Sequence, residues 1–188
     1  MPSPHSHNRD NKIIGDRRAN GNKRVQRLAS LSICLALTLT LSYVEYLVIP
    51  PIFPGVKLGI SNVLIMFIFF RYGVWDAVCV SLMRVGISSL LLGNLSSFTF
   101  SLCGAVLSIL ALVICSLARD RVSRIGTSVL SAAMHGIGQI LAAAIIYSSV
   151  GVVYYLPFLL LLSLPIGAVS GCMLILIEER ISPNVMTQ

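Results

Sequence analysis

The stretch LASLSICLALTLTLSYVEYLVI, residues 28–49, carries a single charged side chain, Glu45, in an otherwise apolar and small-residue sequence. A helix needs about 20 predominantly apolar residues to cross the hydrocarbon core of a bilayer. Backbone groups inside that core have no water to bond, so a continuous apolar run of this length must be helical. The stretch therefore predicts a transmembrane helix.

Five more apolar runs follow with short breaks and extend this prediction to the whole chain. The first of them is short for a span, and together they cover residues 56–72, 74–92, 98–118, 125–150 and 152–177. Of the 188 residues, 56% are hydrophobic and only 11% are charged, whereas soluble domains carry about 25% charged residues. The composition excludes a water-soluble globular enzyme and predicts an all-α membrane protein, a six-transmembrane-helix bundle.

Polar sequence flanks the apolar runs at both ends of the chain. Residues 1–27 hold seven of the 14 Lys and Arg residues and have no periodic apolar face. Such a composition predicts a disordered basic cytoplasmic tail. Residues 28–178 form the predicted transmembrane domain, and residues 179–188 form a second cytoplasmic tail.

The basic residues decide the predicted orientation, because cytoplasmic loops are enriched in Lys and Arg. With the amino terminus inside, the first tail, Arg71, the 119–124 segment and Arg180 face the cytoplasm, and only Lys57 lies in an outer loop. If the short second run were re-entrant, the 119–124 cluster would lie outside instead. We therefore expect six spans in the inner membrane of a bacterial cell, with both termini cytoplasmic.

Six polar or charged residues fall within or at the edge of the predicted spans. A charge at mid-membrane costs about 2.5–3.5 kcal/mol, so such residues usually face the bundle interior or a watery cavity. Two of them are four residues apart and share one helix face. We expect an outward-opening substrate-binding pocket formed by Glu45, Lys57, Asn62, Arg84, His135 and Gln139.

The same residues also have structural explanations, which the sequence leaves open. Arg84 can form a structural ion pair with Glu45, and Lys57 can be an interfacial anchor. The remaining residues, Asn62, His135 and Gln139, can form hydrogen bonds between helices. If the residues bind a ligand, Lys57 and the amino terminus of the second span favour an anionic group.

Small residues recur every four positions on two of the spans and allow the close approach of another helix. Ser32, Ala36 and Thr40 lie on the first span, and Gly167 and Gly171 lie on the sixth. Each stripe can pack within the bundle or dock a partner membrane subunit.

Sequence motifs for ATP hydrolysis and for common catalytic sites are absent. The chain contains no Walker A motif, no nucleophile elbow and no HExxH, and its five cysteines show no metal-ligand spacing. Its seven acidic residues include one adjacent pair, Glu178–Glu179, and no aspartate-rich cluster that could hold magnesium on a diphosphate. We expect no catalytic residues, no metal, no cofactor and no nucleic-acid partner.

The run E-x-x-x-I-P-P-x-x-P-G-V-K-L-G-x-x-N, residues 45–62, resembles the signature of the Gx transporter family. Arg84, the stretch LLGNLSSFTFSLCGAVLS and the HGIGQ patch at residues 135–139 are also similar to that family. Gly136 departs from the pattern, since Asn is expected there. The resemblance covers residues 28–178, and the family is often labelled heptaprenyl diphosphate synthase component I.

The chain also resembles the substrate-binding (S) components of energy-coupling-factor transporters. These small six-helix proteins work with a separate transmembrane coupling subunit and two ATPase subunits. The resemblance implies that the loop at residues 50–57 and the polar residues form the binding site, and that Ser32, Ala36 and Thr40 form the docking face. It implies a subunit that captures a small metabolite, anionic or prenyl-like, for ATP-driven uptake.

Two other functions remain open. The family label suggests a noncatalytic membrane subunit associated with heptaprenyl or polyprenyl diphosphate synthesis. Alternatively, the chain is a scaffold without a ligand, and the polar residues only hold its helices together.

Overall fold

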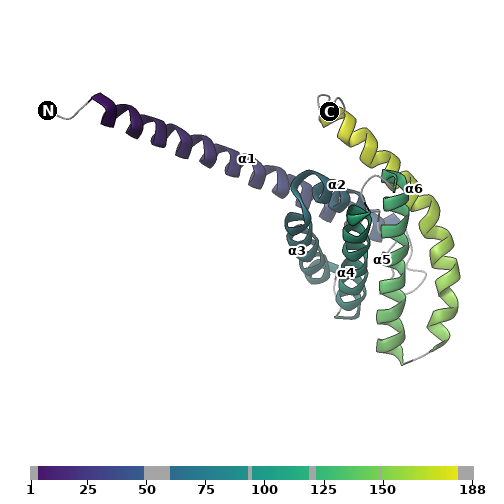
Figure 1. Ribbon diagram of the computed structural model, residues 1–188. Coiled ribbons are helices and arrows are strands. Elements are labelled where there is room, and N and C mark those ends of the chain that lie inside the picture. The colour runs from purple at the N-terminus through teal and green to yellow at the C-terminus, as the bar shows by residue number, and fades with distance from the viewer. Residues whose placement is uncertain (1–3, 49–59, 93–94, 119–121, 149, 182–188) are drawn as a thin grey trace.

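The computed structural model describes residues 4–48, 60–92, 95–118, 122–148 and 150–181, and every regular element in these ranges is a helix (Figure 1). The prediction of an all-α protein is confirmed. In chain order the elements are α1 (Pro4–Val48), α2 (Asn62–Tyr72), α3 (Val74–Leu92), α4 (Leu95–Leu117), α5 (Arg124–Tyr147), the 3₁₀ helix η2 (Val150–Tyr155) and α6 (Leu156–Ile181).

Five segments of this chain are long and apolar enough to cross a membrane. They cover residues 21–47 of α1, 74–91 of α3, 98–117 of α4, 124–147 of α5 and 151–180 of η2 and α6. Many large apolar side chains on these helices are exposed on the bundle surface, where a bilayer would solvate them. The chain is therefore a multi-pass helical membrane protein.

α2 is too short to cross a bilayer. Its 11 residues rise about 16 Å, about half of the hydrocarbon thickness. Ser61 and Asn62 at its amino-terminal end are buried, whereas Arg71 at the other end is exposed. The predicted span begins at residue 56, and residues 49–59 lie outside the described ranges. The count of six spans therefore stays a prediction.

A single residue, Gly73, joins α2 to α3. Its φ of 104° lies in the left-handed region, which glycine adopts at little cost. Its N–H donates to the carbonyl oxygens of Ile68 and Phe69 at 3.2 and 3.1 Å and caps α2. This turn folds α3 back against α2.

α2 forms the centre of the main apolar core. A helix that is apolar on all sides is buried on all sides, and α2 is surrounded by α1, α3, α4 and α6. The buried members of this core are Cys34, Ile65, Met66, Phe67, Ile68, Phe69, Ala77, Val80, Leu112 and Leu174.

α5 packs between α4 and α6, and glycines allow it to approach both. A Cβ atom on Gly138 would lie 2.5 Å from a backbone oxygen of α4. A Cβ on Gly167 of α6 would lie 2.6 Å from Val129 Cα, and one on Gly171 would lie 2.8 Å from Ile125 Cα. The glycine stripe of the sixth predicted span thus packs inside the bundle.

Ion pairs gather four chain segments at one end of the bundle. Arg27 Nε donates to Asp76 Oδ2 at 2.8 Å and links α1 to α3. Arg124 Nε lies 3.7 Å from Glu178 Oε2 and links α5 to α6. Trp75, beside Asp76, is 82% exposed, and exposed tryptophan is typical of a membrane–water interface. We call this end of the bundle the basic end.

Both ends of the chain differ from the sequence prediction. α1 continues without a break to Pro4, where we expected disordered sequence up to residue 27, and Figure 1 shows this part extending away from the other helices. No proline lies between Pro4 and the end of α1 at Val48, and each further helical residue adds one hydrogen bond. α6 likewise runs to Ile181, past the expected boundary at residue 178, where Glu178 pairs with Arg124.

Candidate functional site

Five of the six predicted site residues lie in the described ranges, and all five are buried. Their exposed fractions are 5% for Glu45, 6% for Asn62, 5% for Arg84, 4% for His135 and 0% for Gln139. They belong to α1, α2, α3 and α5, so four helices turn polar side chains inward. The sixth residue, Lys57, lies outside the described residues, as does the predicted binding loop at residues 50–57.

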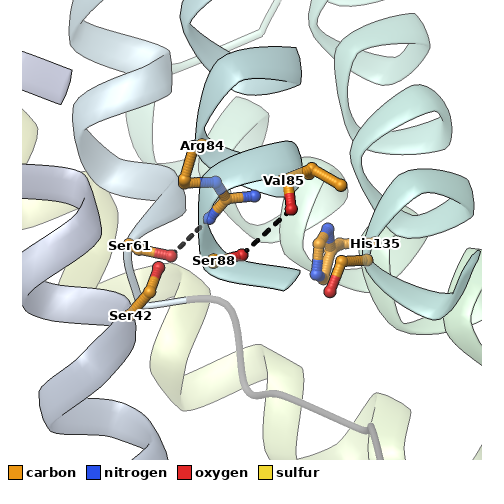
Figure 2. A pocket seen from close by; sticks show the side chains of 7 residues that line it. Ser42, Ser61, Arg84, Val85, Ser88 and His135 are labelled. Carbon is orange, nitrogen blue, oxygen red and sulfur yellow. Dashed lines mark hydrogen bonds between the residues drawn. The ribbon is translucent and has the colours of Figure 1, made fainter. Parts of the chain in front are cut away.

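A small cavity lies beside the guanidinium group of Arg84 (Figure 2). The centre of a water molecule can occupy about 10 Å³ of it, which is the space of roughly one water. All but one of its lining residues are polar: Ser42 of α1, Ser61 next to α2, Arg84, Val85 and Ser88 of α3, Ser101 of α4 and His135 of α5. We call this space the Arg84 cavity.

A hydroxyl group and an opposite charge hold Arg84. One terminal nitrogen of Arg84 donates to Ser61 Oγ, and the buried carboxylate of Glu45 attracts the guanidinium. Arg84 Nε is buried and has no hydrogen-bond partner within the described part of the chain. An unsatisfied buried donor costs about 1–3 kcal/mol, so a hydrogen bond from this N–H to an acceptor would be stabilising.

Asn62 does not line the Arg84 cavity and forms its hydrogen bonds elsewhere in the bundle. Its Nδ2 donates to Ser108 Oγ of α4 at 2.7 Å and to Ser131 Oγ of α5 at 3.0 Å, and the two hydroxyl oxygens are 2.7 Å apart. All three side chains are buried. The network links α2, α4 and α5. Asn62 therefore forms hydrogen bonds between helices, which is the structural role that the sequence left open as an alternative to ligand binding.

Gly104 of α4 has no side chain and so leaves space for the imidazole of His135. A Cβ atom on Gly104 would lie 2.8 Å from His135 Cε1, so a larger residue there would collide with the imidazole. One turn along α5, Gln139 Nε2 lies 3.2 Å from His135 Nε2. Gln139 is fully buried and is not among the lining residues, so it supports the imidazole from behind.

The sequence did not predict the four serines of the cavity wall. A serine hydroxyl in an apolar run can bond to its own helix, as Ser88 Oγ does with the carbonyl oxygen of Val85 at 3.3 Å. Serine therefore carries little signal by itself. Spacing offered a partial signal, because Ser88 lies four residues after Arg84 and shares its helix face.

The predicted docking residues lie on the surface of α1. Ser32, Ala36 and Thr40 are all exposed. The Thr40 hydroxyl donates to the carbonyl oxygen of Ala36 in the same helix at 2.9 Å. The stripe is therefore a shallow exposed face, and its docking role stays a prediction.

A larger hollow, which the sequence did not predict, lies at the basic end. It offers about 490 Å³ between α2, α4 and α5, and its lining residues are Phe70, Cys115, Ser116, Val122, Ser123, Arg124 and Thr127. The guanidinium of Arg124 lies 3.9 Å above the Phe70 ring, within the range of a cation–π contact. The hollow combines an exposed cation with an aromatic wall.

Helices of membrane length around buried ionic and hydroxyl side chains define a multi-pass membrane protein with a polar interior. Residues 34–177 match the family described as heptaprenyl diphosphate synthase component I, and the chain belongs to that family. The match includes every residue that lines the Arg84 cavity. No curated protein and no solved structure matches the chain.

Proposed function

We propose that this chain is the substrate-binding subunit of an ATP-driven uptake transporter, similar to the S components of energy-coupling-factor transporters. It captures a small metabolite at the Arg84 cavity. The observation that carries the proposal is the convergence of polar side chains from five helical segments on one buried arginine. Ionisable residues inside membrane helices are costly and usually mark ligand or ion pathways.

The cavity has the size expected of a closed state. It can hold one ligand atom but not a whole metabolite. Opening requires α1 and α3, which carry Glu45 and Arg84, to move relative to α4 and α5, which carry Ser101 and His135. The apolar core around α2 lies outside this cavity and can serve as the hinge.

The proposed orientation places the basic end in the cytoplasm of a bacterial cell, with six spans and both termini inside. Arg27 and Arg124 lie at that end, in agreement with the enrichment of basic residues in cytoplasmic loops. Exposed tyrosines support a second interface at the opposite end, namely Tyr43, Tyr46, Tyr147 and Tyr154. Substrate would enter from the tyrosine side.

ATP-driven transport requires partner subunits, because this chain has no Walker A motif. We expect a transmembrane coupling subunit and ATPase subunits. The exposed stripe of Ser32, Ala36 and Thr40 is the proposed contact for the coupling subunit, since small residues let helices approach closely in membranes.

The test is to purify the full-length protein from its native membrane and to identify co-purifying proteins and released small molecules by mass spectrometry. We expect ATPase and coupling subunits, and a ligand that Arg84→Gln no longer retains. Ser163→Ala is the control, because this buried hydroxyl bonds within α6 and lies outside the cavity. Equal ligand retention by the Arg84→Gln protein would remove the cavity from the proposal.

A noncatalytic membrane subunit associated with heptaprenyl or polyprenyl diphosphate synthesis is the second candidate. The family description supports it, and the hollow at Arg124 and Phe70 offers a cation beside an apolar wall. No three His, Cys, Asp or Glu side chains of the described residues are placed to hold a metal ion, and prenyl transfer needs metal-bound diphosphate. A soluble aspartate-rich synthase that co-purifies in place of ATPases would favour this candidate.

A further inference from the structure

We infer that the Arg84 cavity recognises a carboxylate group of the ligand and receives one of its oxygen atoms. The inference rests on the proposed function, which it deepens by naming the substrate class. It starts from two buried hydrogen-bonding atoms that belong to residues lining the same small space.

Arg84 Nε and Ser101 Oγ are the two atoms. Both side chains are 5% exposed, both line the cavity, and neither atom has a hydrogen-bond partner among the residues that the structure describes. The Nε–H group can only donate, and a serine hydroxyl can donate as well. A cavity lined by these two side chains therefore suits an acceptor, and oxygen is the acceptor that metabolites commonly carry.

The charges around the cavity favour an oxygen that carries negative charge. A guanidinium stays protonated even when buried. Ser61 occupies the position before α2, and its side chain accepts from Arg84 instead of capping the helix. The amino terminus of α2 thus adds its partial positive charge beside the cavity.

Glu45 opposes this preference and makes it testable. Its carboxylate attracts Arg84 and repels a second anion nearby. A guanidinium has five donors in one plane, so Arg84 can interact with Glu45 and still present Nε–H to a ligand. Removing the charge of Glu45 should therefore strengthen the binding of an anion, whereas removing the charge of Arg84 should abolish it.

The size of the cavity selects among anions. Space for about one water admits one oxygen of a flat carboxylate. A phosphate group would bring several oxygens around a tetrahedral centre into the same space. Arginine also matches the planar geometry of a carboxylate.

The experiment uses the full-length protein in lipid nanodiscs and follows thermal unfolding at constant ionic strength. The probes are formate and acetate, their neutral counterparts formamide and acetamide, and inorganic phosphate. A ligand that binds only the folded state raises its stability with concentration, so the curves give apparent affinities. We expect stabilisation by the two carboxylates and by none of the other probes.

Four variants locate the effect. Arg84→Gln should lose the stabilisation by carboxylates, and Glu45→Gln should bind formate more tightly than the unchanged protein. Ser101→Ala should weaken binding about five-fold, as expected for the loss of one hydrogen bond. Ser163→Ala should leave the affinity unchanged, since its hydroxyl is buried in α6 away from the cavity.

Three results would overturn the inference: equal stabilisation by carboxylates and amides, no stabilisation by carboxylates, or unchanged carboxylate affinity in both Ser101→Ala and Glu45→Gln. The last comparison decides the matter even if Arg84→Gln does not fold. The proposed function fails separately. ATPase partners with a neutral released ligand would keep the transporter and reject the carboxylate, and carboxylate binding without such partners would do the reverse.

Discussion

The small-residue stripes of α1 and α6 share a four-residue spacing but lie in opposite environments. Gly167 and Gly171 of α6 are buried against the backbone of α5. Ser32, Ala36 and Thr40 of α1 are exposed. The same sequence pattern thus serves helix packing in one region and leaves an open face in the other.

The difference arises because a neighbouring helix can reach the backbone at the glycines of α6 but not at the α1 stripe. At the glycines, no Cβ atom separates the two helices, so α5 fills the space that a side chain would need. At the α1 stripe, each residue keeps its Cβ, and the Thr40 hydroxyl is bonded to its own helix. Substitutions on α6 should therefore change stability, and substitutions on α1 should change association.

Gly167→Leu should destabilise the protein most, by about 3 kcal/mol, because overpacking a tight contact forces backbone shifts. The first added carbon would already lie 2.6 Å from Val129 Cα. Thermal unfolding in nanodiscs measures the change. Gly86→Leu is the matched control, since a Cβ on Gly86 meets nothing within 4 Å. Equal melting temperatures for the two variants would refute the packing role of the α6 stripe.

Asn62→Ala should lower the free energy of unfolding by about 1–3 kcal/mol, because it removes two buried hydrogen bonds. The hydroxyls of Ser108 and Ser131 would then have only their hydrogen bond to one another. The same unfolding assay applies. Thr40→Ala also removes a polar side chain, but from the exposed face of α1, and should change the melting temperature little. A larger loss in Thr40→Ala would contradict the assignment of inner and outer faces.

Arg27→Gln should cost no more than about 1 kcal/mol, because its partner Asp76 lies in an exposed ion pair. The difference from the unchanged protein should shrink as salt is added. A double-mutant cycle with Asp76→Asn measures the pair itself. A coupling that does not respond to salt would show that the contact is not a screened surface pair.

Ala36→Leu should change stability least, by less than about 0.5 kcal/mol, because the side chain is exposed. The informative measurement is the recovery of the coupling subunit with the purified protein, which we expect to fall to background. Leu37→Ala, on the exposed surface outside the stripe, is the control. If Ala36→Leu retains its partner, the stripe is not the docking face.

The sequence predicted best what depends on neighbouring residues. The predicted run at 74–92 coincides with α3, because Gly73 before it and the apolar pattern within it are both local signals. The contact between His135 and Gln139 follows from their four-residue spacing on one helix. The burial of Glu45 and Arg84 follows from the cost of exposing charge to lipid.

Contacts between distant segments could not be predicted in the same way. Asn62 binds Ser108 and Ser131, which are 46 and 69 residues away, and nothing near Asn62 in the sequence specifies either serine. The cavity wall depends on Ser42 and Ser101 for the same reason. The polar composition of residues 1–27 predicts disorder, whereas α1 extends to Pro4, because polar residues also propagate a helix that has already formed.

Gly104 and His135 have a consequence for the evolution of the family. The imidazole ring fills the volume that a Cβ atom at position 104 would need, so the two positions form one packing unit on neighbouring helices. A relative with alanine or serine at position 104 must carry a smaller side chain at position 135 or separate the two helices. The two positions should therefore covary among homologues.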